Sequence, residues 1–342
     1  MPIRRLRIAV LSTVYKATPP VGYGGIERVV HTFVEGLIRA GHDVTLFGAA
    51  GSHCSGRTVE LAGYDPASAP SGINSRRDVI SEEALYDAVR AQLDREPVDV
   101  IHDWSFENLF VTRHPERVPF VISTCIPSAV GYARPQLVAC SAAHAGQIGG
   151  TTRFVHYGLN LPDWQHGAVK SPELAHIAKI ARYKAQHEAI RAARRAGRRL
   201  VVAGNVEDRL YYWTRVRPAL LFARNTVRYI GEVRDTNAVL RTAAALVQTP
   251  RWFDAFPLIV LESLASGTPV IAYDSGGLRE QIVDGVNGFL CRDEDSLAAR
   301  MADADRIRPA DCRAYAEEHF SVERMVANYE AQYEAAMDGE DW

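Results

Sequence analysis

The chain has 342 residues, which exceeds one ordinary domain and suggests two. Its 39 Lys and Arg residues nearly balance its 41 Asp and Glu residues, giving a formal net charge of -2; this excludes a nucleic-acid-binding protein that works by bulk charge. With 47% hydrophobic and 23% charged residues, the composition is globular and excludes collagen-like, disordered and coiled-coil chains.

The cysteine pattern and the lack of long apolar runs indicate the compartment. The five cysteines are scattered and form no C-x-x-C pair; they are Cys54, Cys125, Cys140, Cys291 and Cys312. This spacing predicts neither a zinc site nor a disulfide framework. The sequence has no uncharged apolar run of about 18 residues, and the run at 8–12 is too short for a signal peptide. We therefore expect a cytoplasmic protein with no transmembrane segment.

The first half of the chain alternates between strand patterns and helix patterns. Short apolar runs predict strands at 7–12, 43–47, 98–102, 120–123 and 137–141. Apolar residues at helical spacing predict helices at 25–40 and 81–95, and Gly41 stands where a helix C′ glycine belongs. Residues 52–76, rich in Gly, Ser, Pro and Ala, are expected to form an irregular loop.

The second half repeats this alternation. Strands are predicted at 176–180, 199–203, 226–230, 245–248 and 269–273, and helices at 186–196, 257–266, 309–319 and 321–337. Because strand–helix–strand units form parallel sheets, we expect an α/β protein with two doubly wound, Rossmann-like domains, 1–160 and 161–320. The helix at about 321–337 is expected to pack back onto the first domain. Such sheets bind ligands at the carboxyl ends of their strands, so two facing domains would form a central cleft.

A glycine-rich loop precedes the first predicted helix. It reads Gly-Tyr-Gly-Gly-Ile-Glu over residues 22–27, and such a loop lets backbone N–H groups approach an anion at a helix N-terminus. A dinucleotide fingerprint is excluded, because Glu27 occupies its sixth position and Gly22 lies ten residues beyond Ser12. The alternative is a plain flexible connection between strand and helix.

The strongest local signal is the segment 252–273, WFDAFPLIVLESLASGTPVIAY. Pro257 suits the first helical position. The N–H groups of Leu258 and Ile259 would then be free to hold a phosphate without a cationic side chain.

Two carboxylates accompany this helix. Glu262 follows Pro257 by five residues, about 7.5 Å along the helix axis, which is roughly the span from a diphosphate to a ribose. A carboxylate there can accept hydrogen bonds from the ribose hydroxyls. Asp254 precedes the helix and would face the cleft. The alternative is that both are ordinary charges favoured by the helix dipole.

The lysines are few and two of them lie together. Of the four lysines in the chain, Lys179 ends a predicted strand and Lys184 precedes the next helix. Two cations in one strand-to-helix loop could neutralise a diphosphate leaving group. The alternative is that both are solvated.

Two further patterns are weaker. Residues 293–295 spell D-x-D, a metal-binding motif, but they precede a predicted helix where acidic caps are expected. His102 and Asp103 are adjacent on a predicted strand and so point to opposite faces. They cannot pair with each other, although His102 could still contact an acceptor.

Together these pieces resemble the family 4 glycosyltransferases, which have the two-domain GT-B architecture. The resemblance is densest in 174–333. The matching segments are GYGGIERVV (22–30), IAKIARYKAQ (177–186), RRLVVAG (198–204), VRYIGEV (227–233), DAFPLIVLESLASGTPVIAYDSGGLREQI (254–282), DGVNGFL (284–290) and EEHFSVERMVANYEAQY (317–333).

The resemblance implies retaining transfer of a sugar from a nucleotide-diphosphate donor, UDP-type above all, to a hydroxyl acceptor bound by the N-terminal domain, with no metal and no cofactor. Asp254, Lys179 and Lys184 would be catalytic. On the acceptor side we expect Thr124, which stands where the family has a histidine, and, from its strand position alone, His102. The residues implied in binding the nucleotide sugar are Gly24, Gly25, Val233, Phe256, Leu258, Ile259 and Glu262.

Three positions depart from the family pattern. Asp254 stands where the family has a longer glutamate, and Lys179 replaces an arginine and loses its bidentate fork. The family's N-terminal histidine has no counterpart, since Thr124 and Cys125 stand there. A donor sugar of unusual size or shape would accommodate all three. The chain as a whole also resembles glycosyltransferases of avilamycin-type oligosaccharide antibiotic biosynthesis.

Two other functions stay open from the sequence. One is a nucleotide-sugar epimerase on the same fold, which needs a cluster of acid/base groups around the sugar. The other is a two-domain binding protein that closes on its ligand without chemistry.

Overall fold

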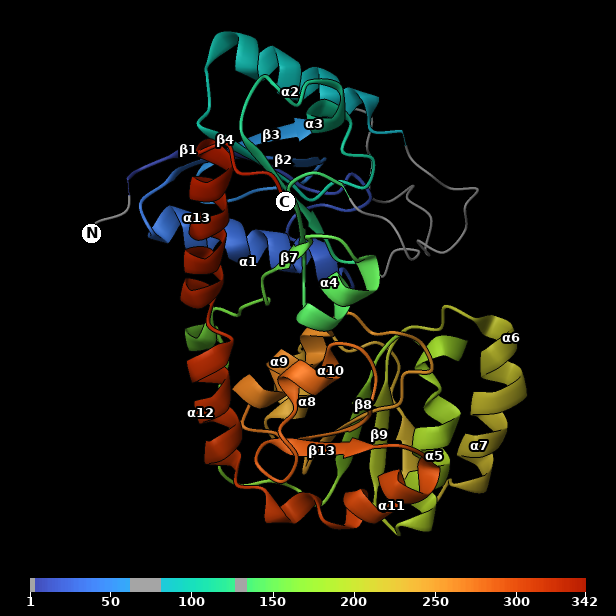
Figure 1. Cartoon of the computed structure of the whole chain (residues 1–342). Coiled ribbons are helices and arrows are strands. Elements are labelled where there is room, and N and C mark those ends of the chain that lie inside the picture. The colour runs from blue at the N-terminus through green and yellow to red at the C-terminus, as the bar shows by residue number, and fades with distance from the viewer. Residues whose placement is uncertain (1–3, 62–80, 127–133) are drawn as a thin grey trace. The chain divides into compact units, whose positions relative to one another are not determined.

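The computed structural model describes residues 4–61, 81–126 and 134–342 (Figure 1). The chain divides into two units. Met1–Asn160 together with Val322–Trp342 form the first unit, and Leu161–Ser321 form the second. Each unit is built on a parallel sheet with helices packed against it, so the predicted fold class of two Rossmann-like α/β domains is confirmed.

In the described part of the first unit, seven parallel strands form one sheet in the order β3-β2-β1-β4-β5-β6-β7. The strands are β1 Arg7–Leu11, β2 Asp43–Ala49, β3 Arg57–Leu61, β4 Val100–Asp103, β5 Phe120–Thr124, β6 Leu137–Ala139 and β7 Arg153–Phe154. The order reverses between β1 and β4, and ligands of doubly wound sheets bind at such a point.

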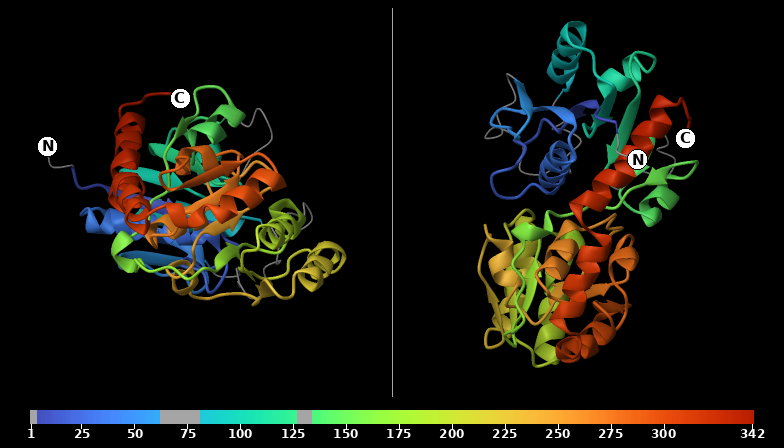
Figure 2. Two further views of the ribbon diagram at one scale, coloured as in Figure 1. Left: turned by 90° about the horizontal axis from the view of Figure 1, so that it is seen from below. Right: turned by 90° about the vertical axis from the view of Figure 1, so that its left-hand side faces the viewer.

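Helices cover the sheet of the first unit. They are α1 Gly25–Arg39, α2 Glu83–Arg95, α3 Leu109–Arg113, α4 Ala142–Ile148 and α13 Val322–Met337. The helix α1 buries Val30, Phe33, Val34 and Leu37, which recur at helical spacing. The last helix, α13, packs against α1 and β5, so the chain returns to the first unit at its end (Figure 2).

The second unit contains a described sheet of six parallel strands in the order β10-β9-β8-β11-β12-β13. They are β8 Leu174–Ile177, β9 Leu200–Ala203, β10 Val227–Tyr229, β11 Leu246–Gln248, β12 Val270–Tyr273 and β13 Gly288–Cys291. Every residue of β8, β9 and β12 is buried, which is why these segments read as continuous apolar runs rather than alternating ones.

Two groups of helices flank this second sheet (Figure 1). They are α5 Gln186–Arg195, α6 Arg209–Tyr211, α7 Arg217–Phe222, α8 Thr236–Leu240, α9 Leu258–Ala265, α10 Leu278–Gln281, α11 Glu294–Ala302 and α12 Pro309–His319. The helix α5 packs with α7 and α11, whereas α9 packs with α8 and α12. No helix in the described ranges is long and apolar enough to cross a membrane.

The structure corrects two sequence expectations and adds one helical segment that was not predicted. Residues 57–61 form the edge strand β3, not an irregular loop, because RTVEL pairs in parallel with β2; the rest of that predicted loop, 62–76, lies outside the described residues. Pro257 is the N-cap of α9, not its first helical residue. The helical segment between Arg209 and Phe222 was not predicted, because its aromatic and arginine residues follow no clear apolar period.

Candidate active site

The loop between β11 and α9 holds Asp254 at the carboxyl end of the second sheet. Its backbone is fixed by the turn at residues 275–277, because the Gly277 N–H donates to the Asp254 carbonyl at 2.9 Å. Gly276 has a φ of +53°, and a Cβ there would lie 2.2 Å from the same carbonyl. Only glycine permits this close approach. The Ser-Gly-Gly sequence of this turn is therefore part of the site.

Lys184 and Asp254 form an ion pair. The Lys184 Nζ lies 2.5 Å from the Asp254 Oδ2, and the two side chains are 17% and 10% exposed. The Trp252 Nε1–H donates to the same oxygen at 3.3 Å, and the Lys184 Nζ lies 5.1 Å from the centre of the Trp252 ring. An ion pair and a hydrogen bond thus fix the Asp254 carboxylate, and a cation–π contact holds its partner Lys184 against the Trp252 ring.

Lys179 has a carboxylate partner of its own. Its Nζ lies 2.5 Å from the Glu207 Oε2, and the Tyr183 hydroxyl donates to the Glu207 Oε1 at 3.1 Å. The rings of Tyr183 and Trp252 are 4.8 Å apart. The two aromatic side chains therefore connect the two ion pairs into one cluster, which brings the predicted residues Lys179, Lys184 and Asp254 together.

Glu207, Tyr183 and Trp252 were missed by sequence reasoning. Glu207 lies 28 positions from Lys179, so only the folded chain brings them together. The one signal for Glu207 was its place shortly after β9, where a parallel sheet gathers its ligand-binding residues. Trp252 lies inside the segment 252–273, but no pattern in the sequence assigns it a role.

The start of α9 offers backbone donors beside this cluster. Pro257 is in extended conformation as N-cap, and no side chain caps the helix. Leu258 and Ile259 are half-buried in the first turn, and first-turn N–H groups have no acceptor within their own helix. The helix end can therefore hold an anion through its N–H groups and dipole.

Glu262 lies further along α9 and is buried. Its Oε2 accepts a hydrogen bond from the Thr236 hydroxyl at 3.2 Å, and Thr236 begins α8 directly after the loop that holds the half-buried Val233. Phe256 is 4% exposed, and its ring packs 5.8 Å from that of Phe320. Its side chain therefore belongs to the core of the second unit, and only its backbone is left for a ligand.

In the first unit, the glycine-rich loop is tightly held. Gly24 is the N-cap of α1, and a Cβ there would lie 2.6 Å from the Pro20 Cβ. Glu27 is buried and accepts a hydrogen bond from the Thr13 hydroxyl at 2.5 Å. At Gly25 a Cβ would meet nothing within 4 Å. Gly24 thus serves close packing, while the backbone at Gly25 can be approached.

The structure corrects the assignment of His102. Its side chain is fully buried, with the Nδ1 2.6 Å from the Tyr333 hydroxyl and the Nε2 2.8 Å from the Ser123 hydroxyl. Burial holds the pKa of His102 well below its ordinary value. His102 is thus a neutral core residue with both nitrogens engaged, which leaves no atom for an acceptor.

Thr124, by contrast, ends β5 and lines a pocket of about 190 Å³ in the first unit. Its hydroxyl donates to the Ile126 carbonyl at 3.4 Å. Ser123 and Cys125 line the same pocket.

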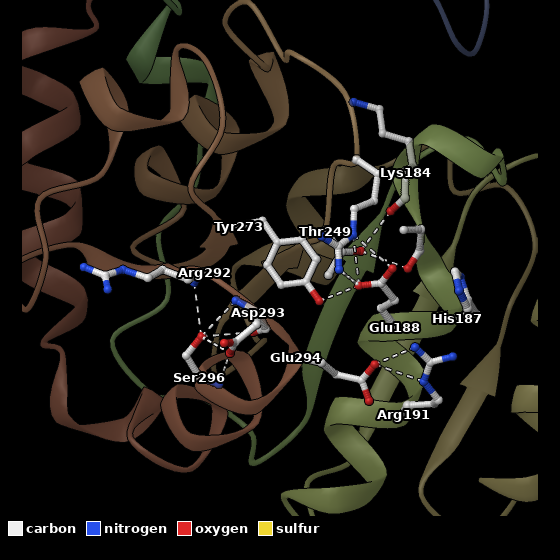
Figure 3. A network of polar contacts seen from close by, with 12 residues as sticks. Lys184, His187, Glu188, Arg191, Thr249, Tyr273, Arg292, Asp293, Glu294 and Ser296 are labelled. Atoms are coloured by element: carbon white, nitrogen blue, oxygen red, sulfur yellow. Dashed lines mark hydrogen bonds and ion pairs between the residues drawn. The ribbon is translucent and has the colours of Figure 1, made fainter.

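The D-x-D sequence caps α11 (Figure 3). Asp293 accepts the Ser296 N–H at 2.8 Å, and Glu294 pairs with Arg191 at 2.5 Å. Nearby, the Tyr273 hydroxyl donates to Glu188. The capping interpretation is confirmed. Among residues 4–61, 81–126 and 134–342, no group of three or more His, Cys, Asp or Glu side chains is placed to hold a metal ion.

Comparisons with known proteins bear on both units. The family model "Glycosyl transferases group 1" matches residues 163–319, and "Glycosyltransferase Family 4" matches residues 23–124. A glycogen synthase of Mycobacterium tuberculosis is 25% identical over an alignment of 370 positions, gaps included, which covers 86% of this chain and 85% of that protein.

Solved structures share the fold. AviGT4, a glycosyltransferase involved in avilamycin A biosynthesis, superposes with a TM-score of 0.78 at 22% identity, covering 98% of this chain and 99% of AviGT4. Anabaena Alr3699/HepE, solved in complex with UDP-glucose, superposes with a TM-score of 0.71 at 15% identity, covering 97% of this chain and 100% of that protein. Family models in both units and relatives aligned over most of their length identify the chain as a glycosyltransferase with the GT-B fold.

Proposed function

We propose that the protein transfers a sugar from a UDP-type donor to a hydroxyl acceptor, with retention of anomeric configuration and without a metal. The observation that carries this proposal is the cluster of Lys179, Lys184 and Asp254 beside the start of α9. Two cations and a helix N-terminus are suited to a diphosphate. That HepE was solved with UDP-glucose supports a uridine nucleotide.

The diphosphate would lie between the lysines and the first turn of α9. Leu258 and Ile259 would donate backbone N–H groups to it. Lys179 and Lys184 would bind it in competition with their present partners Glu207 and Asp254. Because negative charge grows on the leaving diphosphate, the lysines act more strongly on the transition state than on the bound donor.

The nucleoside would extend along α9. The carboxylate of Glu262 lies one further turn along the helix and would accept hydrogen bonds from the ribose hydroxyls. Val233, in the loop after β10, would contact the base. Gly24 and Gly25 stay proposed contacts of the nucleotide sugar.

The reaction proposed is a front-face displacement, in which the leaving phosphate oxygen takes the proton of the acceptor hydroxyl. The Asp254 Oδ2 is held by Lys184 and Trp252, and its Oδ1 is left to orient the donor sugar and stabilise positive charge on the ring. A covalent route would need a carboxylate beneath the anomeric carbon, whereas Asp254 lies on the phosphate side. A front-face displacement needs no histidine base at the positions of Thr124 and Cys125.

The acceptor proposed is a hydroxyl of a small molecule or oligosaccharide, and an oligosaccharide natural product of the avilamycin type is the specific candidate. The structural similarity to AviGT4 over nearly the whole chain supports this class. Thr124 stays the proposed acceptor-side residue, because it lines a pocket at the carboxyl end of β5.

The test is donor turnover without acceptor. The protein is incubated with UDP-, GDP- and dTDP-sugars, and the products are identified by NMR. Slow release of free sugar from a UDP-sugar supports the proposal. Isomerised nucleotide sugar would instead indicate an epimerase, and an absence of both binding and turnover would indicate that no nucleotide sugar is the substrate.

A further inference from the structure

A helical segment on the second unit presents apolar side chains to solvent. It runs through α6, a π-helical turn at Tyr212–Val216, and α7, where Pro218 lies in the first turn. Proline lacks an N–H, which accounts for the widened turn before it. The segment packs against α5 (Figure 1) and buries Tyr211 and Val216, so its other side faces outward.

Four large apolar residues lie on that outward side. Their exposed fractions are 66% for Leu210, 63% for Trp213, 56% for Leu221 and 77% for Phe222. Single exposed apolar residues are common on protein surfaces, but four within one short helical segment indicate an interaction surface.

The same segment is strongly basic. Arginines stand at 209, 215 and 217 within it and at 224 just beyond its end, and no acidic residue occurs between 209 and 224. Within the described ranges these four arginines form no ion pair, whereas Arg306 and Arg308 of the same unit pair with Asp303 and Asp311. The Arg217 guanidinium lies 5.8 Å from the Trp213 ring centre. The positive charge of the segment is therefore available to an external anion.

We propose that this surface, here called the α6–α7 surface, binds an anionic lipid membrane. It consists of Leu210, Trp213, Leu221 and Phe222 with Arg209, Arg215, Arg217 and Arg224. Tryptophan, leucine and phenylalanine beside arginine are typical of helices that lie in the membrane interface. Arginines near the interface are attracted to anionic headgroups.

The charge of the α6–α7 surface favours an anionic membrane over a second copy of the chain as its binding partner. A symmetric dimer through the α6–α7 surface would bring four arginines against four others, and like charges that face each other across an interface are unfavourable. A planar anionic surface satisfies all four at once. The inference concerns where the enzyme acts and is independent of the proposed donor and reaction.

The experiment is flotation with lipid vesicles at low salt. The full-length protein is expected to float with phosphatidylcholine vesicles that contain phosphatidylglycerol and to stay behind with phosphatidylcholine alone. Each arginine near an anionic surface contributes roughly a fivefold gain in partitioning, so Arg215→Glu/Arg217→Glu should lower the partition coefficient at least about 25-fold.

The matched control is Arg306→Glu/Arg308→Glu. Both side chains are exposed, at 78% and 80%, and the change in net charge is the same as in the first double variant. This control should float like the parent. Equal losses in the two double variants would overturn the proposal, because total charge and not the α6–α7 surface would then govern binding.

A second variant tests the apolar part. Trp213→Ser/Phe222→Ser should lose most of the flotation, whereas Val283→Ser/Val286→Ser, whose side chains are also exposed, should keep it. Thermal melts confirm that each variant folds. A parent that does not float with anionic vesicles refutes the proposal. A concentration-dependent dimer that Trp213→Ser/Phe222→Ser abolishes, without vesicle binding, would assign the surface to self-association.

Discussion

The ion pair between Lys184 and Asp254 should couple strongly in a double-mutant cycle. Its atoms are 2.5 Å apart, and the side chains are only 17% and 10% exposed. The cycle uses Lys184→Met, Asp254→Asn and the double variant, because these replacements keep the approximate size of each side chain and remove its charge.

The expected coupling free energy follows from the burial of the two side chains. Breaking a fully buried pair by removing one partner costs 3–5 kcal/mol, because one charge stays buried without compensation. This pair keeps some contact with water, and Asp254 retains its bond from Trp252, so we expect a coupling free energy of about 1–3 kcal/mol.

The assay is urea unfolding of all four proteins, with the free energy of unfolding taken from each curve. The matched control is the cycle of Arg191→Met and Glu294→Gln, a pair also 2.5 Å apart but 49% and 23% exposed. Exposed pairs couple by about 0.2–1 kcal/mol. A Lys184–Asp254 coupling no larger than that of the control would refute the buried pairing from which the site is built.

Two further predictions concern the candidate site, and one concerns a buried histidine of the second unit. Glu262→Gln should weaken UDP binding by about 1.5–3 kcal/mol, because it removes a charged acceptor for the ribose; equal affinity in calorimetry would exclude the ribose contact. Lys179→Ala should lower the rate of donor hydrolysis more than donor affinity, since charge grows on the diphosphate in the transition state; unchanged turnover would contradict its role. Burial lowers the pKa of His176 to about 4, from 6.5 in the unfolded chain. The unfolded state then binds more protons between these values, so stability should fall as the pH drops from 6.5 towards 4, and His176→Gln should reduce that slope by up to about 1.4 kcal/mol per pH unit.

Much of the fold could be predicted because its buried strands are recognisable in the sequence. The fully buried β8, β9 and β12 appear in the sequence as short apolar runs, and the helices between them keep a helical period. Such local patterns define a parallel sheet without knowledge of its contacts. The edge strand β3 was missed because its exposed residues lack such a run.

The site was predictable only where one segment contains it. Asp254, the start of α9 and Glu262 fall in a single motif, so their spacing could be read from helix geometry. Glu207 contacts Lys179 from the loop after another strand, β9. No local sequence pattern predicts that contact. His102 was misassigned for the same reason, since Tyr333, which engages its Nδ1, lies 231 positions away on α13.

The most direct test of the central claim is the product stereochemistry of Asp254→Asn beside the parent. Both proteins are given a UDP-sugar and an oligosaccharide acceptor, and the anomer is followed by proton NMR from the first turnovers. We predict a retained anomer in both proteins, with the variant roughly 10–100-fold slower, because the proposed role of Asp254 is only to orient the donor and stabilise ring charge. An inverted product, or a glycosyl adduct trapped on Asp254, would contradict this account.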